Sequence, residues 1–197
     1  MIVYLGMPKC ASTWLYDKIK QNFDYDGKKE PHTLVEYGTT NNNLIDFSTN
    51  NWSMDSSTAL KIDKDVSKYI FIVRDPIELA ISYYMQTRLD GESFNDFIFS
   101  LVKTKLICFG DIVERWYKLV DNRKILIYDY NQDIQGKHQS FIADICKNLD
   151  LDGYDQTVPL QDKIFSTHNK PKLKCTDANL NAIIKTQVEK FKQITQG

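Results

Sequence analysis

Residues 1–14, MIVYLGMPKCASTW, decide the fold class of this chain. The apolar run at residues 2–5 predicts a short buried strand, and residues 13–21 predict a helix with Ser12 or Thr13 as its N-cap. Residues 6–13 join the strand to the helix. A turn of this kind gathers backbone N–H groups and the positive helix end around one point, which favours binding of an anion such as phosphate.

The same alternation of strand and helix continues along the chain. Residues 69–73 (YIFIV) and 124–128 (KILIY) predict two further buried strands. Helices are expected after Asp75-Pro76, at residues 111–120 and 138–149, and near the C-terminus. This order predicts an α/β fold, with a central parallel sheet between two helix layers. The polar stretch at residues 38–57 is expected to be a long surface loop that contacts the acceptor substrate.

Two of the predicted helices have a clear apolar stripe that should face the core. The first stripe consists of Ile77, Ala80, Ile81, Tyr84 and Met85, and the second of Leu180, Ile183, Ile184, Val188 and Phe191.

Composition limits the class of protein. The chain has 197 residues, 42% of them apolar, and a formal net charge of −1. These values predict one globular domain over residues 1–197 and argue against non-specific nucleic-acid binding. The four cysteines are far apart, which predicts reduced thiols and no zinc knuckle. No membrane span and no leader segment are expected, so the protein is predicted to be soluble and cytoplasmic.

The first turn is a poor match to the triphosphate loop G-x-x-x-x-G-K-[ST]. Aligned on Gly6, that pattern puts its lysine at Ser12, whereas the chain has a lysine at Lys9. Lys9 is placed to meet the terminal anionic group of a shorter ligand. An ordinary turn with a surface lysine is the alternative.

A second candidate phosphate site follows the strand at residues 69–73. Arg74 ends that strand, and Ser82 comes eight residues later, off the apolar stripe of the following helix. The guanidinium group provides a planar, permanently charged fork for a phosphate. A surface arginine paired with Asp75, next to a solvated serine, is the alternative.

Both motifs resemble those of the sulfotransferases that use 3′-phosphoadenosine-5′-phosphosulfate (PAPS). Residues 8–14, PKCASTW, resemble the P-K-x-x-[ST]-T-W loop of that family, with Ala11 where the family usually has glycine. Arg74 and Ser82 resemble its 3′-phosphate motif. The resemblance implies a P-loop-like fold. It also implies roles for particular side chains and amides, with Lys9, Cys10, Ala11, Ser12 and Thr13 at the 5′-phosphosulfate and Arg74 and Ser82 at the 3′-phosphate.

Two further residues have possible roles in nucleotide binding. Trp14 matches an aromatic residue that stacks on adenine in some family members, although packing in the core would equally explain it. Lys170 lies in residues 166–172, STHNKPK, where the family has a basic loop over the nucleotide. A solvated basic loop would also explain that segment.

Residues 28–32, KKEPH, resemble the K-E-x-H segment of the heparan-type, glycan-modifying sulfotransferases, in which the glutamate is the catalytic base. Glu30 is therefore the expected base, kept ionised by the flanking lysines, and His32 is the second candidate. A solvated charged turn is a further alternative. The chain has no E-K-S-P segment, so heparan itself is not inferred as the acceptor.

The predicted reaction is in-line attack of an acceptor hydroxyl, expected on a carbohydrate, on the sulfur of PAPS. The product nucleotide is adenosine 3′,5′-bisphosphate (PAP). Lys9 would stabilise the leaving phosphate, so no metal is expected. A nucleotide kinase with Asp129 as a metal ligand is one alternative. A non-catalytic module that binds PAPS or a glycan is the other.

Overall fold

A computed structural model describes residues 1–23, 45–88, 90–134, 138–148 and 172–196. The chain divides into two compact units, and each unit is made of two segments of sequence. The first unit contains residues 1–73 and 120–166, and the second contains residues 74–119 and 167–197. The single domain expected over residues 1–197 stays a prediction.

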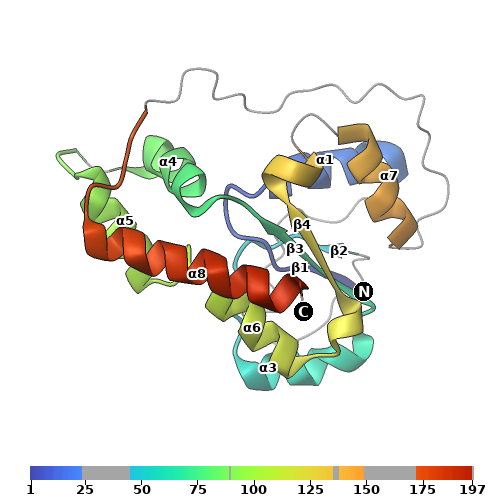
Figure 1. Cartoon of the computed structure of the whole chain (residues 1–197). Coiled ribbons are helices and arrows are strands. Elements are labelled where there is room, and N and C mark those ends of the chain that lie inside the picture. Colours follow the sequence, from blue (N-terminus) through green and yellow to red (C-terminus); the bar gives the residue numbers. More distant parts are fainter. Residues whose placement is uncertain (24–44, 89, 135–137, 149–171, 197) are drawn as a thin grey trace. The chain divides into compact units, whose positions relative to one another are not determined.

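The first unit contains a sheet of four parallel strands (Figure 1). In the order β2-β1-β3-β4 they are β2 (Ile45–Asp46), β1 (Ile2–Tyr4), β3 (Lys68–Val73) and β4 (Ile125–Asp129). The parallel sheet confirms the predicted fold class. Three of the strands were predicted from sequence, and β2 was not.

Helices cover both sides of this sheet (Figure 1). Helix α1 (Ser12–Phe23) and helix α7 (His138–Asn148) lie on one side, where the rings of Trp14 and Phe141 are 5.9 Å apart. Helix α3 (Ser56–Ile62) lies on the other side. The connections β1→β2 and β2→β3 run in opposite directions across the sheet, so right-handed crossovers place α1 and α3 on opposite faces. Short helical turns occur at Asn51–Ser53, Asp63–Asp65, Asn122–Lys124 and Tyr130–Ile134.

The second unit is helical in its described part. It contains α4 (Pro76–Thr87), α5 (Phe94–Lys103), α6 (Phe109–Leu119) and α8 (Ala178–Gln196). Helix α8 packs closely along α6, because a Cβ on Gly110 would come within 2.6 Å of the Gln187 carbonyl oxygen. The Gln187 side chain accepts a hydrogen bond from the Asp111 amide, and Lys190 forms an ion pair with Asp111 at 2.7 Å.

Two predicted stripe residues do not face the core. Met85 is 45% exposed and Ile183 is 39% exposed, whereas Leu79 and Gln187 are buried in their helices. Gln187 is buried because its side chain is bonded to the start of α6.

The prediction of a surface loop at residues 38–57 is wrong for the part that is described, residues 45–57. This part contains β2 and a helical turn, and Phe47 is fully buried. Three of its polar residues, Asp46, Ser48 and Asn51, are buried and bond to one another: Asp46 Oδ1 accepts from the Ser48 amide and from Asn51 Nδ2. Residues 38–44 lie outside the described residues.

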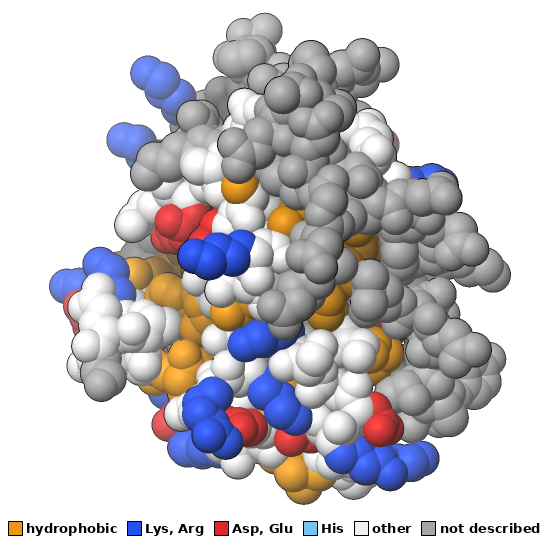
Figure 2. All heavy atoms as spheres, turned by 90° about the vertical axis from the view of Figure 1, so that its right-hand side faces the viewer, with side chains coloured by type: hydrophobic (Ala, Val, Ile, Leu, Met, Phe, Trp, Pro, Cys, Tyr) orange, Lys and Arg blue, Asp and Glu red, His pale blue; other side chains and the backbone are white. Residues whose placement is uncertain are grey.

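Charged side chains of both signs are interleaved on the lower part of the face seen in Figure 2. This arrangement agrees with the nearly balanced composition of the chain. None of the described helices has the length and apolar character needed to cross a membrane.

Candidate nucleotide-binding site

The loop that follows β1 leaves the sheet where ligands of such folds usually bind. Open α/β sheets bind ligands outside the carboxyl ends of the strands, at the point where the direction of winding reverses. In the order β2-β1-β3-β4 that point lies between β1 and β3. The Leu5 amide still bonds to the Ile70 carbonyl of β3 at 2.8 Å, and the chain then turns away from the sheet. The predicted anion loop is therefore at the expected edge of the sheet.

Two residues of this loop have left-handed backbone conformations. Lys9 has φ 69° and Ala11 has φ 62°. Each such conformation costs a non-glycine residue about 1–2 kcal/mol. Left-handed residues within a turn make a concave arrangement of amides that binds anions, and backbone strain of this kind is common at functional sites. The conformation of Ala11 also explains why glycine is usual at this position of the motif.

The N-cap of α1 is Ala11, which corrects the prediction of Ser12 or Thr13. The Leu15 amide bonds to the Ala11 carbonyl at 2.9 Å, so Ser12 and Thr13 already belong to the first helical turn. Alanine has no side-chain acceptor for the amides at the helix start, and the first turn contains no acidic residue. Within the part of the chain that the structure describes, the positive end of α1 therefore has neither a capping side chain nor an acidic residue in its first turn.

The side chains of the loop differ in exposure. Cys10 and Ser12 are buried, Lys9 is half-buried and Thr13 is exposed. Trp14 is only 9% exposed and lies against Phe141, which gives it a packing role in the core. Contact between Trp14 and adenine stays a prediction.

The second motif begins a helix in the other unit. Asp75 caps α4, because its side chain accepts hydrogen bonds from the Ile77 and Glu78 amides, both at 2.9 Å. Asp75 therefore has a structural role, and Arg74 forms an ion pair with Glu78 at 3.6 Å. Ser82 is half-buried on α4. The sequence reasoning missed Glu78, although its spacing of four residues from Arg74 on a predicted helix was the available signal.

Three predicted site residues, Glu30, His32 and Lys170, lie outside the described residues. Their predicted roles are neither confirmed nor contradicted.

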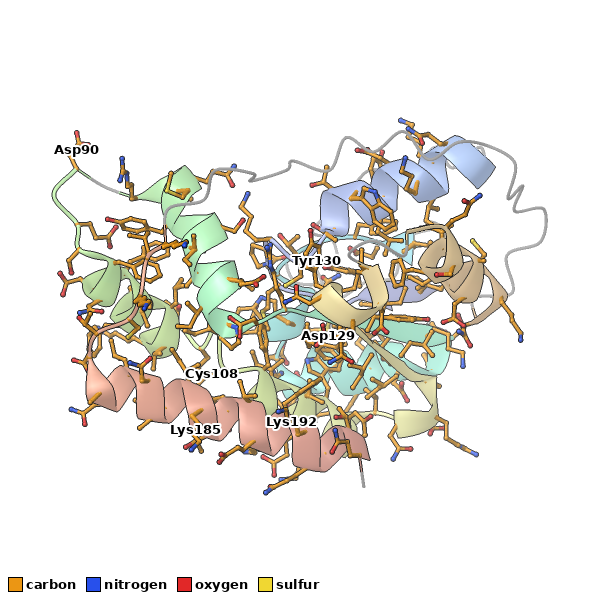
Figure 3. The ribbon with its side chains drawn as sticks, turned by 45° about the horizontal axis from the view of Figure 1, so that its top comes forward. Asp90, Cys108, Asp129, Tyr130, Lys185 and Lys192 are labelled. Carbon is orange, nitrogen blue, oxygen red and sulfur yellow. The ribbon has the colours of Figure 1, made fainter. Side chains whose placement is uncertain are left out.

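Asp129, the metal ligand of the kinase alternative, also caps a turn. Its carboxylate accepts hydrogen bonds from the Asn131 and Gln132 amides at 2.8 and 3.0 Å, just beyond the end of β4 (Figure 3). Strand β3 separates β4 from β1 and its loop. No group of three metal-binding side chains occurs within the described ranges.

All four cysteines lie in the described part of the chain, and no two of them form a disulfide. Burial raises the pKa of the Cys146 thiol to about 11, and burial together with Asp111 raises the pKa of Cys108. Both groups are therefore neutral thiols near neutral pH.

The parallel sheet and the loop after its first strand define a P-loop-like α/β fold. The family model of the sulfotransferase domain matches residues 1–197, so the chain belongs to the sulfotransferase family. This membership makes it a PAPS-dependent sulfotransferase.

The fold agrees with a solved structure. A sulfotransferase from Alicyclobacillus acidocaldarius superimposes with a TM-score of 0.68 over 98% of this chain and 94% of that one, at 11% identity. At this identity the likeness concerns the fold alone. No curated protein sequence matches the chain.

Proposed function

We propose that this sulfotransferase transfers the sulfuryl group of PAPS to a hydroxyl group on a carbohydrate. The donor follows from the family. The carbohydrate acceptor rests on the resemblance of residues 28–32, KKEPH, to the K-E-x-H segment of the glycan-modifying members.

The proposed donor site rests on the structure at the start of α1. Lys9 and the backbone amides of Ala11, Ser12 and Thr13 would hold the 5′-phosphosulfate, whereas the Cys10 amide already donates to the Met7 carbonyl at 3.2 Å. Two left-handed residues support this role, and so does a helix start that, among the described residues, has no acidic or capping side chain.

The remaining nucleotide contacts are proposed from the motifs. Arg74 and Ser82 would bind the 3′-phosphate, and this contact would select PAPS over ATP, which has none. Trp14 would contact adenine, and Lys170 would cover the nucleotide.

The acceptor hydroxyl would attack sulfur in line with the leaving group. A new bond forms between the acceptor oxygen and sulfur, and the bond from sulfur to the phosphate oxygen breaks, releasing PAP. Glu30 takes the hydroxyl proton, with His32 as the alternative base. Lys9 and the loop amides would stabilise the charge that develops on the leaving phosphate, so the proposed transfer needs no metal ion.

Calorimetric titration with PAP, beside ATP with and without Mg²⁺, tests the donor site. We expect metal-independent binding of PAP that is lost in Arg74→Ala. Binding of ATP only with Mg²⁺, and no binding of PAP, would instead support a phosphoryl transferase.

A second experiment tests the base. Glu30→Gln should abolish transfer to a glycan acceptor while PAP affinity stays within about twofold, because the amide cannot accept the proton. His32→Gln is the matched variant that tests the alternative base. If Glu30→Gln turns over at close to the wild-type rate, Glu30 is not the base.

Two general properties are also proposed. The four free cysteines support a reducing compartment, in agreement with a cytoplasmic location. The match of one family model to residues 1–197 supports a single sulfotransferase domain.

A further inference from the structure

Tyr4 connects the first strand to the anion loop. It is the last residue of β1 and is fully buried, and its hydroxyl donates a hydrogen bond to the Cys10 carbonyl at 2.7 Å. Its ring lies directly against Gly6, where a Cβ would collide with the hydroxyl oxygen and with Cζ. Gly6 therefore leaves the space through which the Tyr4 hydroxyl reaches the loop.

This hydrogen bond determines the direction of the next backbone amide. No cis peptide bond occurs among the described residues, so the Cys10 carbonyl and the Ala11 N–H point in opposite directions. The carbonyl points inward to the buried hydroxyl of Tyr4, and the Ala11 N–H therefore points away from it. Within the described ranges the Ala11 N–H makes no hydrogen bond. It is left available at the start of α1.

Tyr4 is itself held in place from the neighbouring strand. Asn51 Nδ2 donates to the Tyr4 carbonyl oxygen at 3.3 Å and to Asp46 Oδ1 at 3.1 Å. The Phe47 ring packs on the Tyr4 ring, with centroids 6.2 Å apart. These contacts come from β2 and the residues after it, so the hydroxyl has a fixed position under the loop.

We propose that Tyr4 is a positioning residue for sulfuryl transfer, an inference that rests on the proposed donor site. Its hydroxyl holds the Cys10–Ala11 peptide so that the Ala11 N–H faces the 5′-phosphate of the nucleotide. Neither the loop motif nor the family match assigns a role to this residue. Tyr4 does not touch the nucleotide and acts only through the peptide that it orients.

The test compares two ligands that differ only in the 5′-phosphate. Tyr4→Phe should weaken PAP binding about tenfold, as expected for one misdirected hydrogen bond to a charged group, and leave the affinity for adenosine 3′-monophosphate unchanged. Transfer from PAPS should slow by at least the same factor. An equal loss for both ligands, or no loss for either, would overturn the proposal.

Two further sets of variants separate this role from a loss of stability. Tyr69→Phe and Tyr128→Phe remove hydroxyls that bond to Asp63 and Asp144, and they should lower stability without changing the ratio of the two affinities. Gly6→Ala displaces the Tyr4 hydroxyl by adding a methyl group beside it. This variant should also lose affinity for PAP but not for adenosine 3′-monophosphate. If the wild-type protein does not bind PAP at all, the proposed donor site fails, which is a different outcome from failure of the Tyr4 role.

Discussion

The strand-to-helix connections after β1 and after β3 leave neighbouring strands of one sheet but are built in opposite ways. The connection after β3 is fully capped: Asp75 accepts two amides of α4, and Pro76 occupies the first helical position. The connection after β1 has two left-handed residues, and α1 has an alanine as its N-cap. The capped connection after β3 stabilises helix α4. The connection after β1 leaves amides of α1 that could bind an anion.

The difference shows that stability and binding compete for the same groups. An amide that is capped by a side chain cannot also bind a phosphate. Ala11 leaves the first amides of α1 uncapped, whereas Asp75 caps those of α4. The left-handed conformations of Lys9 and Ala11 add backbone strain, which would be the cost of the proposed anion site.

A carboxylate placed at the start of α1 should make this helix start resemble the capped start of α4. Of the changes considered, it should have the largest effect, on PAP affinity. Thr13→Glu places a negative charge in the first turn, at an exposed position. PAP affinity should fall about 100-fold by charge repulsion at close range, while the melting temperature does not fall. Calorimetry and thermal unfolding measure the two effects. Thr13→Gln is the neutral control, and unchanged PAP binding by Thr13→Glu would place the 5′-phosphate elsewhere.

Removing the cap of α4 should have the next largest effect, on stability. Asp75→Ala leaves two amides without an acceptor and should lower the free energy of unfolding by about 1 kcal/mol or slightly more. Urea unfolding measures this change. Asp75→Asn preserves the cap and should lose much less. Equal losses for the two variants would show that the charge of Asp75, rather than its hydrogen bonds, supports the helix.

Relieving the strain of the α1 connection should stabilise the protein by less. Ala11→Gly removes the clash of a left-handed alanine but adds freedom to the unfolded chain, for a net gain of about 0.5–1 kcal/mol. Ala182→Gly, at an exposed position of α8, should instead destabilise the protein by about 1 kcal/mol. The two changes in urea midpoint should therefore have opposite signs. A loss of stability in Ala11→Gly would contradict the left-handed conformation.

The smallest expected effect concerns the ion pair of Arg74. Glu78→Gln removes a carboxylate 3.6 Å from the guanidinium that is proposed to bind the 3′-phosphate, and PAP affinity should rise about twofold. Glu189→Gln makes the same charge change on α8 and should leave the affinity unchanged. A fall in affinity would mean that Glu78 orients Arg74 instead of competing for it.

Local sequence predicted most of the long elements and the position of the loop because their signals are local, although helix α5 (Phe94–Lys103) was not predicted. The apolar runs at residues 69–73 and 124–128 became β3 and β4, and Asp75-Pro76 began α4 as predicted. Strand β2 was missed because it is two residues long and its polar residue, Asp46, is buried, where it accepts hydrogen bonds from the Ser48 amide and from Asn51 Nδ2. The polar composition of residues 38–57 had instead predicted an exposed loop.

The sequence by itself determined the α/β alternation and the loop motif, because apolar periodicity and residue spacing depend on near neighbours. Only the tertiary structure decided which residue caps α1, which residues are left-handed and what lies under the loop. The Tyr4 hydroxyl reaches Cys10 through the space at Gly6, and Asn51 holds Tyr4 from 47 residues away. Such contacts depend on how strands pair and side chains pack, and no local pattern contains that information.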